Sequence, residues 1–355
     1  MGDGTKIEWT DATWNPVIGC SRVSPGCDNC YAIGVVHREM SPQHVGLTTK
    51  SIPVDWTGEV RPAPQSVLEK PLHWKRSRRI FVNSLSDLFH ADLPDEEIAK
   101  VFAVMALAPQ HTFQVLTKRS KRMRDLLTTE EFWARVFELA ILRGADVVPI
   151  RGADRLRYHL PNVWLGVSIE NDSYSFRANH LRETPAAVRM ISAEPLLGPL
   201  PSLDLTGIDW LIVGGESGPK AHPMHPAWAR DLRDRCVSRR TLSCRHGGRR
   251  IHLWQPGESC PPSGPETALP TLGEPAFLFK QWGEWGPAGS WPGPDHHVDG
   301  HGVLYQPGET APYVAGGHET AAMHRWGKKV AGRVLDGRTW DEFPQPPKDH
   351  PHAHR

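Results

Sequence analysis

Three cysteines lie close together near the start of the chain. They are Cys20, Cys27 and Cys30, in the spacing C-x6-C-x2-C. Three thiolates can hold three corners of an iron–sulfur cube and leave the fourth iron open to a substrate or cofactor. A structural zinc site, in contrast, normally has all four positions filled by protein ligands. Three cysteine ligands, rather than four protein ligands, therefore predict a metal centre that binds a substrate or cofactor.

Other residues offer alternative metal sites. His37 lies seven residues after Cys30 and could complete a Cys3His zinc site. Cys236 ends a predicted helix, and we expect it to be a buried thiol. A second group could form a small zinc site, although its spacing matches no standard pattern: Cys244, His246, His252 and Cys260.

The bulk properties limit the class of protein. The chain has 355 residues, 39% of them hydrophobic, and no apolar run long enough to span a membrane. Its first residues lack a charged and then apolar signal layout, so we expect a soluble, cytoplasmic protein. The net charge of +1 gives no global attraction to nucleic acid, and six cysteines are too few for a disulfide scaffold.

Short apolar runs alternate with helical patterns along the chain. Six runs predict buried strands, and a seventh precedes the cysteines: 79–84, 112–116, 163–168, 188–192, 209–213, 276–279 and 13–18. Four stretches predict helices: 94–107, 130–143, 174–183 and 226–236. This alternation predicts an α/β fold with a parallel sheet of about seven βα steps.

Polar residues follow nearly every predicted strand. In a βα barrel the loops after the strands form the active face. Strand ends also become polar simply where they meet water, so the pattern has two explanations. The residues concerned are Ser84, Asp87, Lys118, Arg119, Glu170, Asn171, Glu194, Glu216 and Lys280.

Three further regions stand apart from this pattern. Residues 239–275 read as an insertion, residues 286–320 show little periodicity, and the chain from 344 onward reads as a tail. The basic stretch 118–124 could contact nucleic-acid phosphates, or it could be the solvated face of a helix.

A set of short motifs resembles the phage-associated three-cysteine-motif family of unknown function, which is itself similar to radical SAM proteins. The likeness covers residues 5–238, 275–285 and 325–344. It implies a partial (β/α) barrel resembling the radical SAM core over residues 1–285, and an irregular extension over 286–355. The motifs are Asn15–Cys20, Gly26–Ala32, Ser86–Phe89, Leu116–Arg119, Asn162–Ser168, Glu194–Gly198, Gly214–Gly218, Lys280–Gly283 and Leu335–Gly337.

The resemblance also implies the cofactors. It places a [4Fe-4S] cluster on Cys20, Cys27 and Cys30 and S-adenosylmethionine (SAM) on the open iron. The commonest radical SAM spacing is C-x3-C-x2-C, so the longer first gap here is typical only of variant members. In this chemistry the cluster delivers an electron to SAM, and the radical that forms takes a hydrogen from the substrate. A reductant protein or flavodoxin-like donor is then an implied partner.

Site roles follow from the same resemblance. Glu216, after Gly214 and Gly215, resembles the contact to the SAM amino group, but it follows a late strand and could serve the substrate instead. Glu194 is equally placed, and Lys280 could bind a carboxylate or phosphate. The remaining implied cofactor contacts are Tyr31 near the adenine or cluster, Glu170 and Asn171 at the ribose, Lys118 at an anionic group, and Ser168 and Ser192 at strand ends.

The sequence thus favours an iron–sulfur, SAM-dependent radical enzyme. We expect its substrate to be a nucleic acid or a nucleotide rather than a small metabolite or peptide. Two alternatives stay open. One is a zinc-stabilised, non-catalytic nucleic-acid-binding module that uses the three cysteines and His37. The other is an iron–sulfur protein that does not cleave SAM. The sequence does not determine the oligomeric state.

Overall fold

The structure is a computed structural model. It describes residues 5–38, 42–144, 158–237, 243–246, 249–253, 275–289, 296–307, 309 and 320–344. No helix within these ranges is long and apolar enough to cross a membrane.

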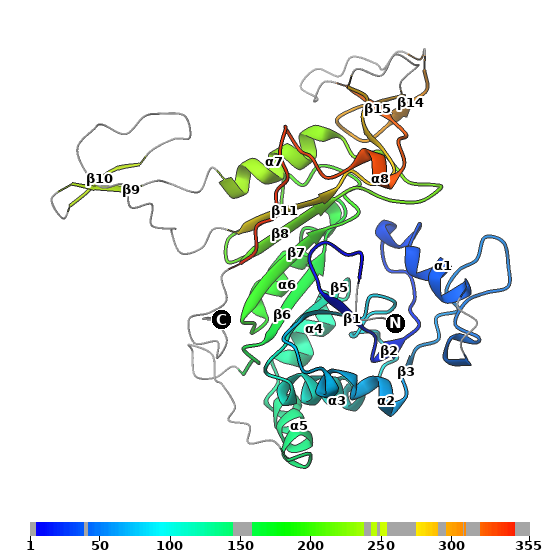
Figure 1. Cartoon of the computed structure of the whole chain (residues 1–355), viewed down its shortest axis with the longest axis vertical. Helices are drawn as coiled ribbons and strands as arrows, with labels where there is room; N and C mark the ends of the chain where they lie inside the picture. The colour runs from blue at the N-terminus through cyan, green and yellow to red at the C-terminus, as the bar shows by residue number, and fades with distance from the viewer. Residues whose placement is uncertain are drawn as a thin grey trace.

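A seven-stranded sheet curls into a half-barrel at the centre of the molecule (Figure 1). Neighbouring strands are parallel throughout, and they follow one another in chain order. This confirms the predicted parallel α/β fold, and sequential order is the arrangement of βα barrels. The strands are β1 (Ala12–Trp14), β4 (Arg79–Val82), β5 (Thr112–Thr117), β6 (Val163–Ser168), β7 (Val188–Ala193), β8 (Trp210–Gly214) and β11 (Ala276–Gln281).

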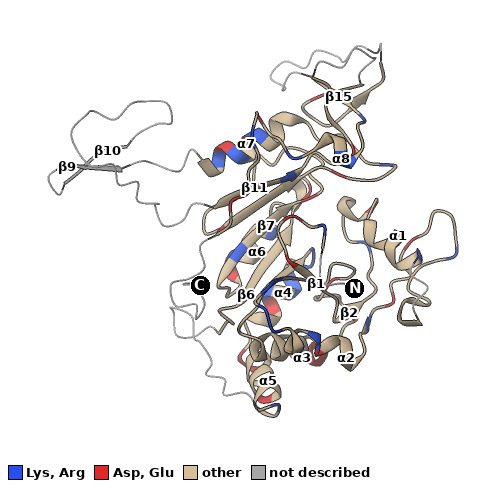
Figure 2. Cartoon of the chain, in the orientation of Figure 1, with Lys and Arg blue, Asp and Glu red and all other residues tan. Residues whose placement is uncertain are grey.

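Helices lie along the outer face of this sheet. α3 starts after Pro94 with three acidic residues, which a helix N-terminus favours. Charges gather on helices such as α4 and α7, and most of the sheet carries none (Figure 2). The helices are α1 (Tyr31–Arg38), α2 (Gln65–Leu68), α3 (Asp95–Leu107), α4 (Ser120–Leu127), α5 (Glu130–Ile141), α6 (Arg177–Glu183), α7 (Pro226–Val237) and α8 (Lys328–Ala331), with 3-10 turns η1 (Pro25–Cys27), η2 (Pro42–His44), η3 (Lys70–His73) and η4 (Asp172–Tyr174).

Alternate residues of each strand face opposite sides of the sheet. In β6, Val163, Leu165 and Val167 join the large core beneath the helices. Trp164, between them, belongs to a second apolar cluster on the concave side. The concave face is thus apolar at its lower end, where the strands begin.

Tryptophans build the floor of the half-barrel. Trp210 packs edge-on against Trp9 and Trp164, with ring centroids 6.2 and 5.9 Å apart. Phe343, near the other end of the chain, lies 5.0 Å from Trp210. Residues from both ends of the described chain therefore close the concave face from below.

The region predicted as an irregular extension contains a small sheet. Its strands run in the order β12 (Gly286–Pro287), β15 (Ala321–His324), β13 (His296–Val298) and β14 (Leu304–Tyr305). These strands are too short to produce a visible period in the sequence. The proposed boundary at 285 between two domains stays a prediction.

Two other strand pairs complete the description. β2 (Val17–Ile18) pairs with β3 (Arg61–Pro62) beside the cysteines. β9 (Ser243–His246) and β10 (Arg249–Leu253) form an antiparallel hairpin within the predicted insertion. Apart from Pro275, the rest of 239–275 lies outside the described residues.

Candidate functional site

The three cysteines share one loop, residues 19–30, which we call the cysteine loop. It follows β2 and leads into α1. A 3-10 turn folds it back, since the Cys27 amide donates to Ser24 at 2.8 Å and the Cys30 amide donates to Cys27 at 3.3 Å. Cys27 lies close enough to act electrostatically on both Cys20 and Cys30. The three thiols are therefore neighbours.

The first anchor of the cysteine loop is Arg119, which follows β5. Its Nη1 lies 3.8 Å from the Cys20 sulfur, and its Nη2 donates to the Ser21 carbonyl at 3.1 Å. Asp87, after β4, holds the guanidinium at 3.2 Å and is itself buried. Asp87 also accepts from the Thr117 hydroxyl at 2.7 Å. The ends of two neighbouring strands thus fix the first cysteine.

Ser21 connects this anchor to a buried histidine. Its hydroxyl accepts from Arg119 Nη2 at 2.8 Å and lies 2.7 Å from His90 Nε2. Burial, followed by the charge of Arg119, lowers the pKa of His90 from its ordinary value. This favours the neutral imidazole, and His90 supports Ser21 through their hydrogen bond.

Glu170, after β6, provides the second anchor. This carboxylate has no exposed surface, and it pairs with Arg177 at 2.9 Å. Its other oxygen lies 3.4 Å from the Gly26 amide of the cysteine loop. Arg177 also donates to the Ser168 carbonyl at 2.7 Å. The Glu170 carboxylate is engaged by protein groups, and its predicted ribose contact stays a prediction.

Glu216, after β8, provides the third anchor. Its Oε2 accepts from Asn29 Nδ2 at 3.1 Å, and Asn29 lies between two of the cysteines. The same oxygen accepts from the His222 amide at 2.9 Å and lies 2.8 Å from its Nδ1. Glu216 is only 5% exposed, and these three contacts all go to its Oε2. The structure shows it holding the loop, while its predicted role toward SAM or substrate stays a prediction.

The surroundings favour neutral thiols in the metal-free protein. Burial, and next the charge of Asp87, raises the pKa of Cys20 to about 12, although Arg119 opposes this. Burial also raises the pKa of Cys30, against the opposing effect of the Ala32 amide and Lys118. Metal binding would therefore displace protons from these sulfurs.

Several predicted residues lie at the upper end of the concave face, where the strands end. Ser168 and Ser192 lie side by side in register, on the same side of the sheet as Trp164. Lys280 pairs with Glu194 at 3.1 Å, and Ser192 donates to the other Glu194 oxygen at 3.3 Å. Both members of the ion pair are less than one-fifth exposed. The structure thus brings together a polar chamber, which we define as Ser168, Ser192, Glu194 and Lys280.

The glycines of this region allow close approach. A Cβ on Gly214 would lie 2.5 Å from Glu194 Oε1, and one on Gly215 would lie 1.9 Å from the Trp282 carbonyl. A side chain at either position would displace its neighbour. The Gly-Gly pair is therefore explained by packing of this edge, and its predicted contact with a cofactor stays a prediction.

Other predicted residues lie around the edge. Tyr31 is 58% exposed, donates to the Ser84 carbonyl at 2.7 Å and lies within electrostatic range of Glu194. Asn171 caps η4 by accepting from the Ser173 amide at 3.1 Å. Lys118 is half-buried beside the cysteine loop.

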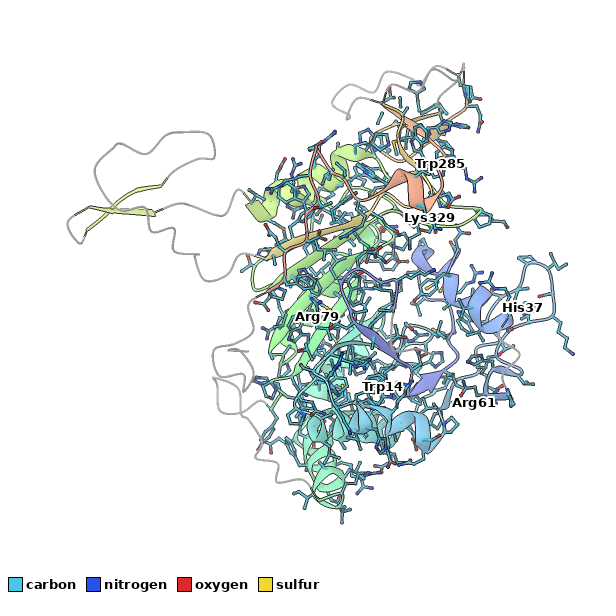
Figure 3. All side chains as sticks on the ribbon, in the orientation of Figure 1. Trp14, His37, Arg61, Arg79, Trp285 and Lys329 are labelled. Atoms are coloured by element: carbon cyan, nitrogen blue, oxygen red, sulfur yellow. The ribbon has the colours of Figure 1, made fainter. Side chains whose placement is uncertain are left out.

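The alternative metal ligands lie elsewhere or are not described. His37 is exposed on α1 and lies 3.1 Å from the Thr48 hydroxyl (Figure 3). Cys236 is buried, as predicted, and forms no disulfide. Among the described residues, no three His, Cys, Asp or Glu side chains converge on a point where one metal ion could bind. The side chains of Cys244, His246, His252 and Cys260 lie outside the described residues.

The sequence analysis missed four supporting residues. Ser21 and Asn29 are the loop residues that bond to Arg119 and Glu216, respectively. His90 contacts Ser21, and Arg177 pairs with Glu170. The available signal was the position of Ser21 and Asn29 beside cysteines. Nothing in the sequence pairs either of them with a strand end about 100 or more residues away.

The fold and site define a class: a parallel α/β half-barrel with a three-cysteine loop bound across the carboxyl ends of its strands. The chain belongs to the family described as "Protein of unknown function (DUF5131)", whose model matches residues 4–242 and 271–344. No curated protein and no solved structure matches the chain.

Proposed function

We propose that the protein is an iron–sulfur enzyme of the radical SAM type. The observation that carries this proposal is the position of the cysteine loop. Residues after β4, β5, β6 and β8 contact it, so it lies over the edge where βα barrels place their active sites. The cysteine loop thus lies at the same edge of the sheet as the polar chamber.

The donor set suits a [4Fe-4S] cluster. In a cubane each thiolate binds a different iron, so the three sulfurs need not converge on one ion. Lys118 and Arg119 are cations that act on Cys30 and Cys20, respectively, and would offset the negative charge of thiolates. Three protein ligands leave one iron for an outside group.

The polar chamber suits the charged end of SAM. SAM carries an amino and a carboxylate group, which bind a carboxylate and a cation, respectively. Glu194 and Lys280 supply that pair, and their mutual contact holds them ready in the unliganded protein. A bound cluster and SAM would together supply one-electron cleavage chemistry. The anchors Glu170, Glu216 and Arg119 then keep the loop in position.

Oxygen-free purification followed by analysis of iron, sulfide and zinc tests the proposal. We expect about four irons and four sulfides per chain. Replacing Cys20, Cys27 and Cys30 by Ala should remove them. Cys236→Ala is the matched control, because this cysteine is buried on α7, outside the cysteine loop, and its loss should leave the iron content unchanged.

A second measurement separates the proposed activity from cluster binding alone. The reduced, cluster-loaded protein should release 5′-deoxyadenosine from SAM, and Lys280→Met should weaken SAM binding while the iron content stays the same. A cluster without SAM cleavage would favour the non-cleaving alternative. About one zinc and no sulfide would overturn the proposal and support the zinc-stabilised module.

Further parts of the proposal follow from the cofactor. A cluster that cycles between oxidation states needs an electron donor, and a flavodoxin-like protein is the class we propose. Free thiols and a cluster suit a reducing compartment, so we propose a cytoplasmic location. The phage association and the action on nucleic acid or a nucleotide are also proposals.

A further inference from the structure

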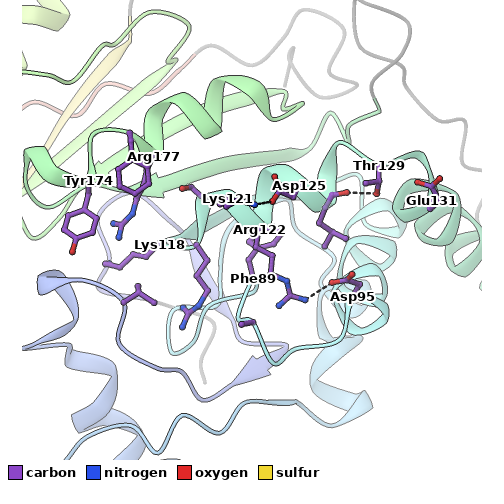
Figure 4. A pocket seen from close by; sticks show the side chains of 16 residues that line it. Phe89, Asp95, Lys118, Lys121, Arg122, Asp125, Thr129, Glu131, Tyr174 and Arg177 are labelled. Atoms are coloured by element: carbon purple, nitrogen blue, oxygen red, sulfur yellow. Dashed lines mark hydrogen bonds and ion pairs between the residues drawn. The ribbon is translucent and has the colours of Figure 1, made fainter.

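A cavity of about 770 Å³ opens beside the cysteine loop (Figure 4). Its walls come from the loop itself at Val23, from the start of α4, and from the segment between η4 and α6. It is distinct from the polar chamber, because none of the chamber residues lines it. Its lining combines basic and aromatic side chains.

Most of the cations that line the cavity are paired with carboxylates. Arg122 pairs with Asp95 at 2.7 Å, Lys121 is bound to Asp125, and Arg119 and Arg177 are held by buried carboxylates. Among the described residues, Lys118 is the one cation of the cavity lining that forms no ion pair with a carboxylate. This leaves a positive charge at the end nearest the cysteine loop. At the opposite end, Asp95 and Asp125 neutralise the neighbouring Arg122 and Lys121, so an anion meets no unpaired cation there.

Aromatic rings lie at the same end as Lys118. Tyr174 and Phe176 are 6.3 Å apart at their centroids, and Phe176 is 48% exposed. The Arg177 guanidinium lies 4.3 Å from the Tyr174 ring and covers one of its faces. Figure 4 shows Lys118 extending toward Tyr174. A cation beside exposed rings is the combination that binds a phosphate and an unpaired base together.

Lys118 also connects the cavity to the cysteine loop. A Cβ placed on Gly26 would lie 3.4 Å from Lys118 Cε, and the ammonium acts electrostatically on Cys30. The amino end of α4, which begins at Ser120, adds a partial positive charge nearby. An anion held by Lys118 would therefore lie beside the cysteine loop, near Gly26 and Cys30.

We infer that this cavity binds a nucleoside phosphate, either free or as one nucleotide of a single strand. Lys118 holds the phosphate, and the base stacks on Phe176 beside Tyr174. The pairing of Arg122 with Asp95 and of Lys121 with Asp125 fixes the direction, because neither cation is left to hold the phosphate at the far end. The role of this nucleotide as the substrate rests on the proposed function, whereas its binding does not.

Fluorescence anisotropy with a labelled ten-nucleotide oligothymidylate tests the inference. The Cys20/Cys27/Cys30→Ala variant is used beside the wild type, so that binding is measured without any cluster. Lys118→Ala and Phe176→Ala should each weaken binding about tenfold. Arg124→Ala is the matched control, since Arg124 lies on α4 but outside the cavity, with its charge tied to Asp125 and Glu183. It should change binding less than about twofold.

The competitors distinguish the two sources of the ligand. Displacement by thymidine monophosphate at concentrations similar to those of the strand indicates a free nucleotide, and displacement only by strands indicates nucleic acid. Both results support the inference. Equal losses in Lys118→Ala and Arg124→Ala, equal binding of duplex, or no effect of Phe176→Ala would each overturn it. Because the cysteine variant binds without metal, a failed iron analysis would leave this test unaffected.

Discussion

Glu216 accepts a hydrogen bond from Asn29 at 3.1 Å, across 187 residues of sequence. This contact joins the middle of the cysteine loop to the end of β8. Asn29 also donates to the Lys220 carbonyl at 3.0 Å, so the loop is bound to both the side chain and the backbone of the segment after β8. The positions of Cys27 and Cys30 therefore depend on β8, which comes much later in the sequence.

A double-mutant cycle on this pair measures the strength of the attachment. Asn29→Ala and Glu216→Gln should each destabilise the protein, and together they should cost less than their sum. We expect a coupling free energy of about 1–2 kcal/mol, because a hydrogen bond to a charged group is stronger than a neutral one. Urea unfolding of the four proteins gives the value. Strict additivity would show that the contact contributes nothing.

Arg119→Ala should destabilise the protein and reduce its iron content together. The side chains of Arg119 and Asp87 are only 11% and 7% exposed, so the substitution leaves a buried carboxylate unpaired. We expect a loss of about 3 kcal/mol. Arg122→Ala, which breaks a surface pair with the 62% exposed Asp95, should cost about 1 kcal/mol or less. Thermal unfolding and iron analysis check both; equal losses would contradict the anchoring role.

Gly215→Ala should be far more harmful than Gly198→Ala. The new Cβ at 215 would lie 1.9 Å from the Trp282 carbonyl, a backbone atom that cannot rotate away. At 198 the nearest atom, Asn171 Cβ, is 3.5 Å away, which is ordinary contact. We expect a cost of about 3 kcal/mol or more at 215 and less than about 1 kcal/mol at 198. Unfolding midpoints in urea provide the comparison, and similar midpoints would refute the close approach.

Asp336→Asn should remove part of the stability of the protein at neutral pH but not at low pH. Arg230, and then Arg233, holds the pKa of Asp336 below its ordinary value. The stabilisation is therefore present above the unfolded pKa of about 3.9 and is lost as pH falls through the lower folded pKa. Asn suits the left-handed backbone at 336, where φ is +51°.

Urea midpoints of the wild type and the Asp336→Asn variant should therefore differ above about pH 5 and converge as the pH falls through the lowered folded pKa of Asp336. A difference that grew on acidification would have the wrong sign. Arg124→Ala serves as a control for the general loss of a surface charge.

The strands were predictable because each is a short apolar run that ends in polar residues. The runs at 163–168, 188–192 and 276–279 correspond to β6, β7 and β11 within two residues. Residues 13–18 were expected as one strand, but they form β1 and β2, which join different sheets. Pro16 lies between them, lacks a backbone donor and interrupts the ladder.

The sequence indicated which residues belong to the site, but it did not indicate how they are arranged. The polar strand ends do meet at one edge, as parallel strands require. Which of them would hold the loop and which would remain available could not be inferred, because that depends on contacts between distant segments. Glu170 and Glu194 look alike in sequence, yet the first is buried against Arg177 and the second faces Lys280.

The tryptophan floor has a consequence for synthesis on the ribosome. Trp210 packs against Trp9, near the start of the chain, and against Phe343, next to the last described residue. The half-barrel therefore stays open from below until almost the last described residue has emerged. Nascent chains stalled before that point should expose indole rings and recruit chaperones, while release of a few more residues completes the core.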